Sequence, residues 1–260
     1  MNDTRQITVA AVCGELDWRY RRSCSGDHYD EAVAHAYVAA CVARQLAQVT
    51  AAAAAGAELV VLPEYAFGAE MFSPIPAAAR RALALREGDT TLVALAGLCR
   101  SLGVTVCGSG DVDHGERGVH QTGFLIDETG RLTLQVKHPR CVPDPPDWPF
   151  DSVPMVYPTA SAVVGITVCS DCTHDPYLPL EMSRLGMDVL LLPGCGFMSD
   201  KWRSFLVVRA RDSQCPVVYA DDGRAAIADS QGDIIACSTT AGEILHATVA
   251  IPVKKSSPDA

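Results

Sequence analysis

The sequence has little of what membrane, nucleic-acid-binding or exported proteins carry. Its first apolar run, Ile7–Val12, is much shorter than the roughly 20 residues that a membrane-spanning helix needs. The residues before it, Met1–Gln6, are polar, so we expect no export signal. Basic residues are outnumbered, with 21 Lys and Arg against 31 Asp and Glu, and the formal net charge is −10. We therefore expect neither nucleic acid nor an anionic membrane as a partner, since both require a basic surface.

The cysteines lack the even number and the regular spacing of a disulfide framework. There are 11 of them, an odd count, in a chain of 260 residues. This pattern is typical of free thiols in a reducing compartment, and it predicts a cytoplasmic protein. The remaining composition, 48% hydrophobic and 20% charged, is that of a globular protein able to bury a sizeable core.

Short apolar runs alternate with segments of helical periodicity. The predicted helices are Asp30–Ala55, Thr91–Leu102, Pro179–Leu185 and Trp202–Gln214. The predicted strands are Ile7–Val12, Leu59–Leu62, Val104–Gly108, Ala162–Val168, Val189–Leu192, Val217–Tyr219 and Leu245–Ile251, and two hairpins pair Thr122–Asp127 with Leu132–Lys137 and Ala225–Ala228 with Ile234–Ser238. The stretch Pro139–Pro158 contains seven prolines and is expected to be a loop with little regular structure.

This mixture of β-α-β units and hairpins predicts an α/β fold. The sheet should be mixed, or two sheets should pack together, with helices on the outside. We expect a single domain over residues 1–253, followed by a polar tail over residues 254–260.

Three of the predicted strands end in residues that can carry chemistry. Glu64 follows Leu59–Leu62, Lys137 closes a hairpin strand, and Cys169 follows Ala162–Val168. The carboxyl ends of strands in α/β sheets form the edge where ligands bind. A thiol with an ordinary pKa of about 8.5 needs help to become a nucleophile, which a nearby lysine or a basic carboxylate provides. Each residue taken alone also fits an ordinary structural role.

The pair Cys169 and Cys172 leaves two other interpretations open. Its spacing is that of a thioredoxin-like redox pair or of half a zinc site. A zinc site needs a second pair, and none follows at a suitable spacing, so we expect no metal. A redox protein of the thioredoxin type is about half as long as this chain.

Read together, the three strand ends resemble the motifs of the nitrilase, or carbon–nitrogen hydrolase, superfamily. The segment Gly56–Gly68 is similar to the glutamate motif of that family, Leu132–Pro139 to its lysine motif, and Val163–Cys172 to its cysteine motif. Segments further along the chain resemble the family in the same order: Leu185–Gly194, Trp202–Ala220 and Ala225–Ala236.

The resemblance implies a four-layer α-β-β-α sandwich and a homodimer or larger homo-oligomer. It implies that Cys169 is the nucleophile, Glu64 the general base and Lys137 a stabiliser of the oxyanion, with help from the backbone N–H of Ser170. No cofactor is implied. The expected reaction is hydrolysis of a small amide or an N-carbamoyl amine. Hydrolysis of a nitrile and transfer of the acyl group to an amine are alternatives, and a non-catalytic interaction protein that keeps the fold is a third.

The sequence departs from the family pattern near the substrate. No glutamate follows the lysine motif, so Asp144 or Asp147 is the candidate to replace the second glutamate of the family. The region after the cysteine is one residue longer, which leaves His174 either in the pocket or at the end of a turn. Further candidates for the substrate side are Trp148, Cys195, Phe197 and Met198. In the helix at Trp202–Gln214, we expect Arg209 and Asp212 to form a structural ion pair.

Overall fold

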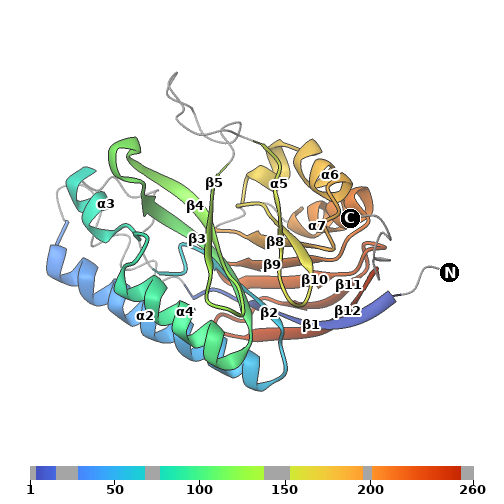
Figure 1. Ribbon diagram of the computed structural model, residues 1–260, viewed down its shortest axis with the longest axis horizontal. Helices are drawn as coiled ribbons and strands as arrows, with labels where there is room; N and C mark the ends of the chain where they lie inside the picture. The colour runs from blue at the N-terminus through green and yellow to red at the C-terminus, as the bar shows by residue number, and fades with distance from the viewer. Residues whose placement is uncertain (1–3, 16–28, 68–76, 138–152, 196–200, 253–260) are drawn as a thin grey trace.

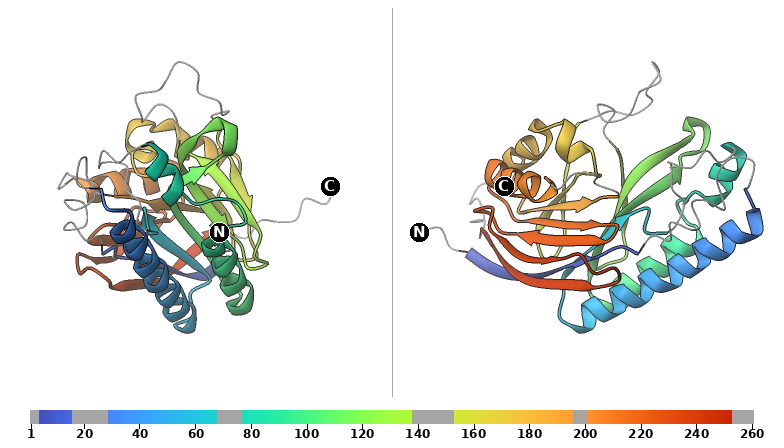
Figure 2. Two further views of the ribbon diagram at one scale, coloured as in Figure 1. Left: turned by 90° about the vertical axis from the view of Figure 1, so that its left-hand side faces the viewer. Right: turned by 180° about the vertical axis from the view of Figure 1, so that it is seen from behind.

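The computed structural model describes residues 4–15, 29–67, 77–137, 153–195 and 201–252 (Figure 1). Two six-stranded sheets pack face to face, and helices lie on the outer face of each (Figures 1 and 2). This is the α-β-β-α sandwich that the sequence predicts. In the described part of the chain, no helix combines the length and the apolar character needed to cross a bilayer.

The first sheet has the strand order β12-β1-β2-β3-β4-β5. Its strands are β1 (Thr4–Val12), β2 (Leu59–Glu64), β3 (Thr105–Asp113), β4 (Val119–Ile126), β5 (Leu132–Val136) and β12 (Ile244–Pro252). Strands β1, β2 and β3 are parallel, and the other neighbours are antiparallel. The helices α2 (Glu31–Ala54), α3 (Ala77–Leu83) and α4 (Thr90–Leu102) belong to this half of the molecule, with a short 3-10 helix, η2 (Gly115–Arg117), between β3 and β4.

The second sheet has the strand order β11-β10-β9-β8-β7-β6. Its strands are β6 (Val156–Pro158), β7 (Val163–Ile166), β8 (Val189–Pro193), β9 (Val217–Asp221), β10 (Arg224–Ala228) and β11 (Ile234–Ser238). Strands β7, β8 and β9 are parallel, and the rest pair antiparallel. The helices of this half are α5 (Asp171–His174), α6 (Tyr177–Arg184) and α7 (Trp202–Ser213).

Side chains along each strand point alternately to the two faces of its sheet, and both faces are covered by apolar contacts. In β1, Val9 and Ala11 point into the core between the sheets, whereas Ala10 and Val12 point to the core under α2 and α4. Successive side chains of a strand point to opposite faces of the sheet. When both faces are covered, all of them are buried, and the sequence of the strand is a continuous apolar run. A third core lies between the second sheet and the helices α6 and α7.

The helix ends follow their capping residues. The Asp30 carboxylate accepts the Val33 N–H at 3.0 Å at the start of α2, and the Asp89 carboxylate accepts the Leu92 N–H at 2.8 Å at the start of α4. Gly103 ends α4 in a left-handed conformation, with φ 64°. These boundaries agree with the predicted ones to within one or two residues.

Some expectations were wrong in detail. The segment Pro139–Pro158 is expected to have little regular structure, and its end forms the three-residue strand β6, which pairs with β7 and was not predicted. Strand β3 continues past Gly108 to Asp113 because β4 pairs with it along its whole length. The helices α3 and α5 were not predicted. The tail over residues 254–260 lies outside the described residues.

Candidate active site

A buried ion pair joins two of the predicted site residues. Glu64 is the last residue of β2, and Lys137 follows the last residue of β5. Their side chains are 1% and 7% exposed, and the Glu64 Oε1 atom lies 3.1 Å from the Lys137 Nζ atom. Burying two charges is costly unless they are paired, so each of these residues requires the other.

Cys169 lies in a sharp turn between β7 and α5. Its φ of 49° is in the left-handed region, which is uncommon for a side chain other than glycine. The turn is held by Asp171, whose carboxylate accepts the Val168 N–H at 3.1 Å while its own N–H donates to the Val168 carbonyl at 3.0 Å. Beneath the turn, the buried Arg209 side chain donates from Nε to the Cys172 carbonyl at 2.5 Å. The nucleophile candidate is therefore fixed from both sides of the turn.

The end of β8 brings Glu64 and Cys169 together. The Cys169 N–H donates to the Pro193 carbonyl at 2.8 Å, and the Glu64 N–H donates to the Gly194 carbonyl at 2.9 Å. The next carbonyl, that of Cys195, lies 3.8 Å from the Cys169 Sγ atom. Glu64 belongs to the first sheet and Cys169 to the second, so these three consecutive carbonyls hold together a site that is built across the two sheets.

Burial and neighbouring charges set the proton affinities in this cluster. Burial raises the pKa of the Glu64 carboxyl above its ordinary value, although the Lys137 ammonium opposes the shift. Burial and the Glu64 charge raise the pKa of the Cys169 thiol well above its usual range. Burial by itself would lower the pKa of Lys137, but the Glu64 carboxylate outweighs it and the net shift is upward. The Glu64 carboxyl and the Cys169 thiol thus both hold a proton more tightly than usual, beside a Lys137 whose pKa is also raised.

A comparison with known protein families identifies the family of the chain. The family model described as carbon-nitrogen hydrolase matches residues 31–255 of the chain. The chain belongs to the carbon–nitrogen hydrolase family. Its catalysed reaction class is thus the hydrolysis of a carbon–nitrogen bond, as the motifs predict.

Solved structures share the fold of this carbon–nitrogen hydrolase. Nit3 of Saccharomyces cerevisiae, a member of branch 10 of the nitrilase superfamily, superposes with a TM-score of 0.72 at 19% identity, over 94% of this chain and 90% of that one. Two mutants of the amidase from Nesterenkonia sp. AN1 superpose with TM-scores of 0.65 at 17% identity. They cover 95% and 93% of this chain, and 90% and 91% of their own lengths. One is a cysteine-to-alanine mutant, and the other, a glutamate-to-glutamine mutant, carries acrylamide added to its active-site cysteine. No curated protein matches the sequence.

The remaining candidates are distributed between the site, the surface and undescribed segments. Ser170 directly follows Cys169 and is partly exposed at the start of α5, while Cys195 is buried and contributes its carbonyl. His174 is exposed at the end of α5, outside the buried cluster. The candidates Asp144, Asp147, Trp148, Phe197 and Met198 lie outside the described residues. The expected ion pair forms, with the Arg209 Nη1 atom 3.3 Å from the Asp212 Oδ2 atom.

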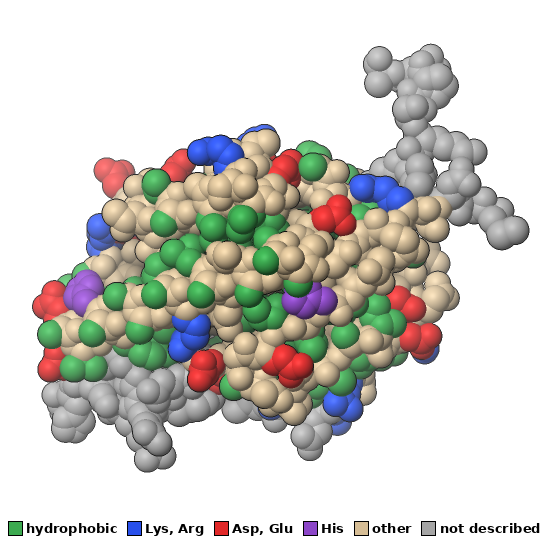
Figure 3. Space-filling model, turned by 90° about the horizontal axis from the view of Figure 1, so that it is seen from below, with side chains coloured by type: hydrophobic (Ala, Val, Ile, Leu, Met, Phe, Trp, Pro, Cys, Tyr) green, Lys and Arg blue, Asp and Glu red, His purple; other side chains and the backbone are tan. Residues whose placement is uncertain are grey.

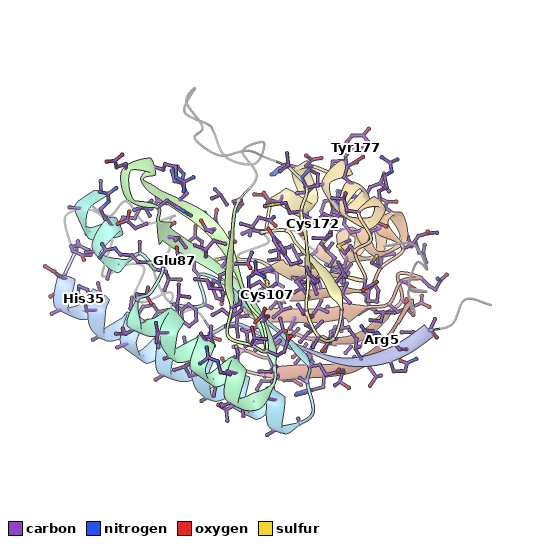
Figure 4. The ribbon with its side chains drawn as sticks, viewed as in Figure 1. Arg5, His35, Glu87, Cys107, Cys172 and Tyr177 are labelled. Atoms are coloured by element: carbon purple, nitrogen blue, oxygen red, sulfur yellow. The ribbon has the colours of Figure 1, made fainter. Side chains whose placement is uncertain are left out.

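The structure also describes both cysteines of the alternative redox interpretation. Cys169 and Cys172 are both free thiols, and Cys172, which lies in α5 (Figure 4), is buried. Burial raises the pKa of the Cys172 thiol to about 11, and its polar neighbours are Arg209 and Thr167 rather than Glu64 and Lys137. The environment of Cys172 is therefore that of a structural cysteine.

Sequence reasoning missed two polar groups that this carbon–nitrogen hydrolase places against Glu64. The side-chain amide of Gln121 donates to the Glu64 Oε1 atom. The fully buried Asp221 lies close enough to raise the pKa of Glu64 and accepts a hydrogen bond from the Tyr219 hydroxyl. Gln121 lies just before the predicted start of its strand, and its position opposite the site depends on strand pairing. The only signal available was its place one residue before the predicted strand, which does not single it out.

Proposed function

We propose that the protein hydrolyses small amides or N-carbamoyl amines through a thioester on Cys169. The observation that carries the proposal is the contact of one buried carboxylate, Glu64, with both the Lys137 ammonium and the Cys169 thiol. Such a carboxylate is basic enough to take a thiol proton, and the ammonium beside it offers positive charge where an oxyanion would form.

The first half of the reaction forms the thioester. Glu64 accepts the Cys169 proton as the sulfur attacks the carbonyl carbon, and the carbonyl oxygen becomes an oxyanion. Lys137 and the Ser170 N–H stabilise that oxyanion, a contribution of roughly 10²–10³ in rate for each well-placed donor. Glu64 then gives its proton to the nitrogen as the carbon–nitrogen bond breaks, which releases the amine or ammonia.

The second half restores the enzyme. Glu64 takes a proton from a water molecule, whose oxygen attacks the thioester carbon. The carbon–sulfur bond breaks, the acid product leaves, and the sulfur regains a proton from Glu64. General acid–base steps of this kind contribute roughly 10²–10⁴ in rate each. A pair of opposite charges leaves the cluster close to neutral, which suits an uncharged amide or carbamoyl group.

A panel of amides, N-carbamoyl amines and nitriles tests this function. Release of ammonia or amine is measured for the wild-type protein and for the Cys169→Ala and Cys172→Ala variants. We expect turnover of an amide or carbamoyl compound that Cys169→Ala abolishes and Cys172→Ala retains. Loss of turnover only in Cys172→Ala would favour the redox interpretation, and no turnover of any compound would contradict the proposal.

The same assay separates hydrolysis from acyl transfer. An amine acceptor is added in one arm, and the products are compared with those formed in water alone. We expect the free acid as the main product in both arms. A new amide as the main product would show that the thioester is captured by the amine instead.

A further inference from the structure

Gln121 is the one side chain in the described residues, besides Lys137, that donates a hydrogen bond to Glu64 Oε1. It lies in β4 and is 6% exposed. Its backbone carbonyl also accepts the Lys137 N–H at 2.9 Å. A single residue of β4 thus fixes the base through its side chain and the adjacent lysine through its backbone.

The two donors share one oxygen of the carboxylate. The Gln121 Nε2 atom and the Lys137 Nζ atom both donate to Oε1, the latter at 3.1 Å. A carboxylate has two oxygens, and fixing one of them also fixes the direction of the other.

The surroundings of Gln121 keep its amide directed at Glu64. Two acceptors besides Glu64 lie near the Gln121 amide: the Tyr65 hydroxyl and Asp111, which is paired directly opposite Gln121 in β3. Both oxygens of Asp111 already bind Arg80 of α3, at 2.6 Å to Nε and 2.7 Å to Nη2. Because Arg80 neutralises Asp111, that carboxylate does not compete with Glu64 for the amide N–H.

We infer that Gln121 is a positioning residue for the base. With Lys137 it holds Oε1 of Glu64, so that Oε2 is the oxygen that takes the Cys169 proton and returns it. The inference rests on the proposed role of Glu64 as the base for Cys169. A neutral amide performs this task without adding charge to a site whose two charges already balance.

The hydrogen bond has a consequence for pH dependence. A donor to the charged form of a carboxyl lowers its pKa, so Gln121 opposes the upward shift that burial imposes on Glu64. Removing the donor should raise that pKa further. The titratable and charged groups that face Glu64 are Lys137 after β5, Cys169 after β7, Asp221 in β9 and Tyr65 after β2, with the Arg80–Asp111 pair behind Gln121.

The test measures the reactivity of Cys169 with iodoacetamide as a function of pH, and it needs no knowledge of the substrate. Four full-length proteins are compared: wild type, Gln121→Leu, Gln121→Glu and Gln135→Leu. Gln135 is the matched control, because it is also a buried glutamine of this sheet but donates to the Ile166 carbonyl at 2.8 Å instead of to Glu64. Alkylation of the Cys169 peptide is followed by mass spectrometry, and melting temperatures report folding.

The rate of alkylation should fall at low pH, where Glu64 is protonated, and we call this part of the pH profile the acid limb. In Gln121→Leu we expect the acid limb to move to higher pH by roughly 1–2 units, which corresponds to the free energy of one hydrogen bond to a charged group. Gln121→Glu has almost the same size and is the variant that tests the inference if Gln121→Leu fails to fold. It should move the limb at least as far, because it replaces a donor with a like charge. Gln135→Leu should lower the melting temperature without moving the limb.

An unchanged limb in folded Gln121→Glu would overturn the inference, and so would an equal shift in Gln135→Leu. Amide hydrolysis is measured on the same samples. Hydrolysis through Cys169 without a shift in the limb contradicts only the role of Gln121. A shift in the limb without hydrolysis of any amide contradicts the proposed function and leaves the role of Gln121 supported.

Discussion

At the scale of single residues, the site concentrates backbone strain next to the reacting groups. Cys169 has φ 49°, and Tyr65, the residue after Glu64, has φ 57°. Conformations of this kind cost about 1–3 kcal/mol each and persist where the surroundings fix them. Glu64, Lys137 and Cys169 were candidates because each follows or ends a predicted strand, and the resemblance of the three segments to one family assigned their roles. The sequence could not predict Gln121 or Asp221, whose approach to Glu64 depends on how strands pair and how the sheets pack.

Replacing Lys137 with methionine should destabilise the protein in a pH-dependent way. The variant leaves Glu64 buried without its counter-charge, which costs about 3–5 kcal/mol when the carboxyl is ionised. Its folded pKa then lies even further above the unfolded value, so the folded state binds the proton more tightly. Stability relative to wild type should therefore fall as the pH rises from acid to neutral. Urea denaturation at a series of pH values measures this.

The matched control is the double variant Lys137→Met with Glu64→Gln. It removes both charges and should recover most of the lost stability at neutral pH, while remaining inactive. If Lys137→Met is as stable as wild type at neutral pH, or if the double variant is no more stable than Lys137→Met, the account of this pair is wrong.

At the scale of elements, periodicity predicted most strands and helices but not the pieces whose order depends on their neighbours. Strand β6 has three residues and is stabilised by pairing with β7. Helix α5 has four residues, and the hydrogen bonds of Asp171 and Arg209 hold it in place. Elements this short cannot be predicted from hydrophobic periodicity, because they are shorter than the several residues over which a repeat can be recognised.

The backbones of the two halves also approach closely at Gly14. Its N–H donates to the Asp221 carbonyl at 2.7 Å, and its carbonyl accepts the Gly223 N–H at 2.9 Å. A Cβ atom here would lie 2.9 Å from the Asp221 carbonyl oxygen and 2.9 Å from Pro63 Cγ. Gly14→Ala should therefore force the sheets apart and lower the free energy of unfolding by about 1–3 kcal/mol, as measured by urea denaturation.

Gly97 provides the control for that substitution. It is exposed in α4, and a Cβ atom there would meet nothing within 4 Å. Gly97→Ala should leave the protein unchanged or stabilise it by up to about 1 kcal/mol, since alanine favours a helix over glycine. Equal stability for the two variants would show that the sheets do not depend on the close approach at Gly14.

At the scale of the whole molecule, the site forms where two similar halves of the chain pack against each other. Each half is a mixed sheet covered by helices, and the ends of β2 and β8 meet where the halves touch. Neither half contains both the base and the nucleophile. The four-layer arrangement could be predicted because six motifs occur in the order of one family. The substrate side could not, because its candidate residues fall where the sequence departs from that family.

Among the described residues, the face of the molecule seen from below gives no comparable indication of a partner. Figure 3 shows acidic and basic side chains scattered among apolar ones on the face seen from below. Tyr177, which is 66% exposed on α6, is the most exposed large apolar side chain of the described residues (Figure 4). The expected homo-oligomer remains a prediction from the family resemblance.

The central claim is that Glu64, Lys137 and Cys169 act as one unit that forms a thioester. The most direct measurement is the intact mass of the protein, quenched in acid during turnover of an amide, followed by mapping of the modified peptide. The account predicts a mass gain equal to the substrate minus ammonia or amine, located on Cys169. The gain should be absent in Cys169→Ala and Glu64→Gln and present in Cys172→Ala. Turnover that persists in Cys169→Ala, or an acyl group found on another residue, would contradict it.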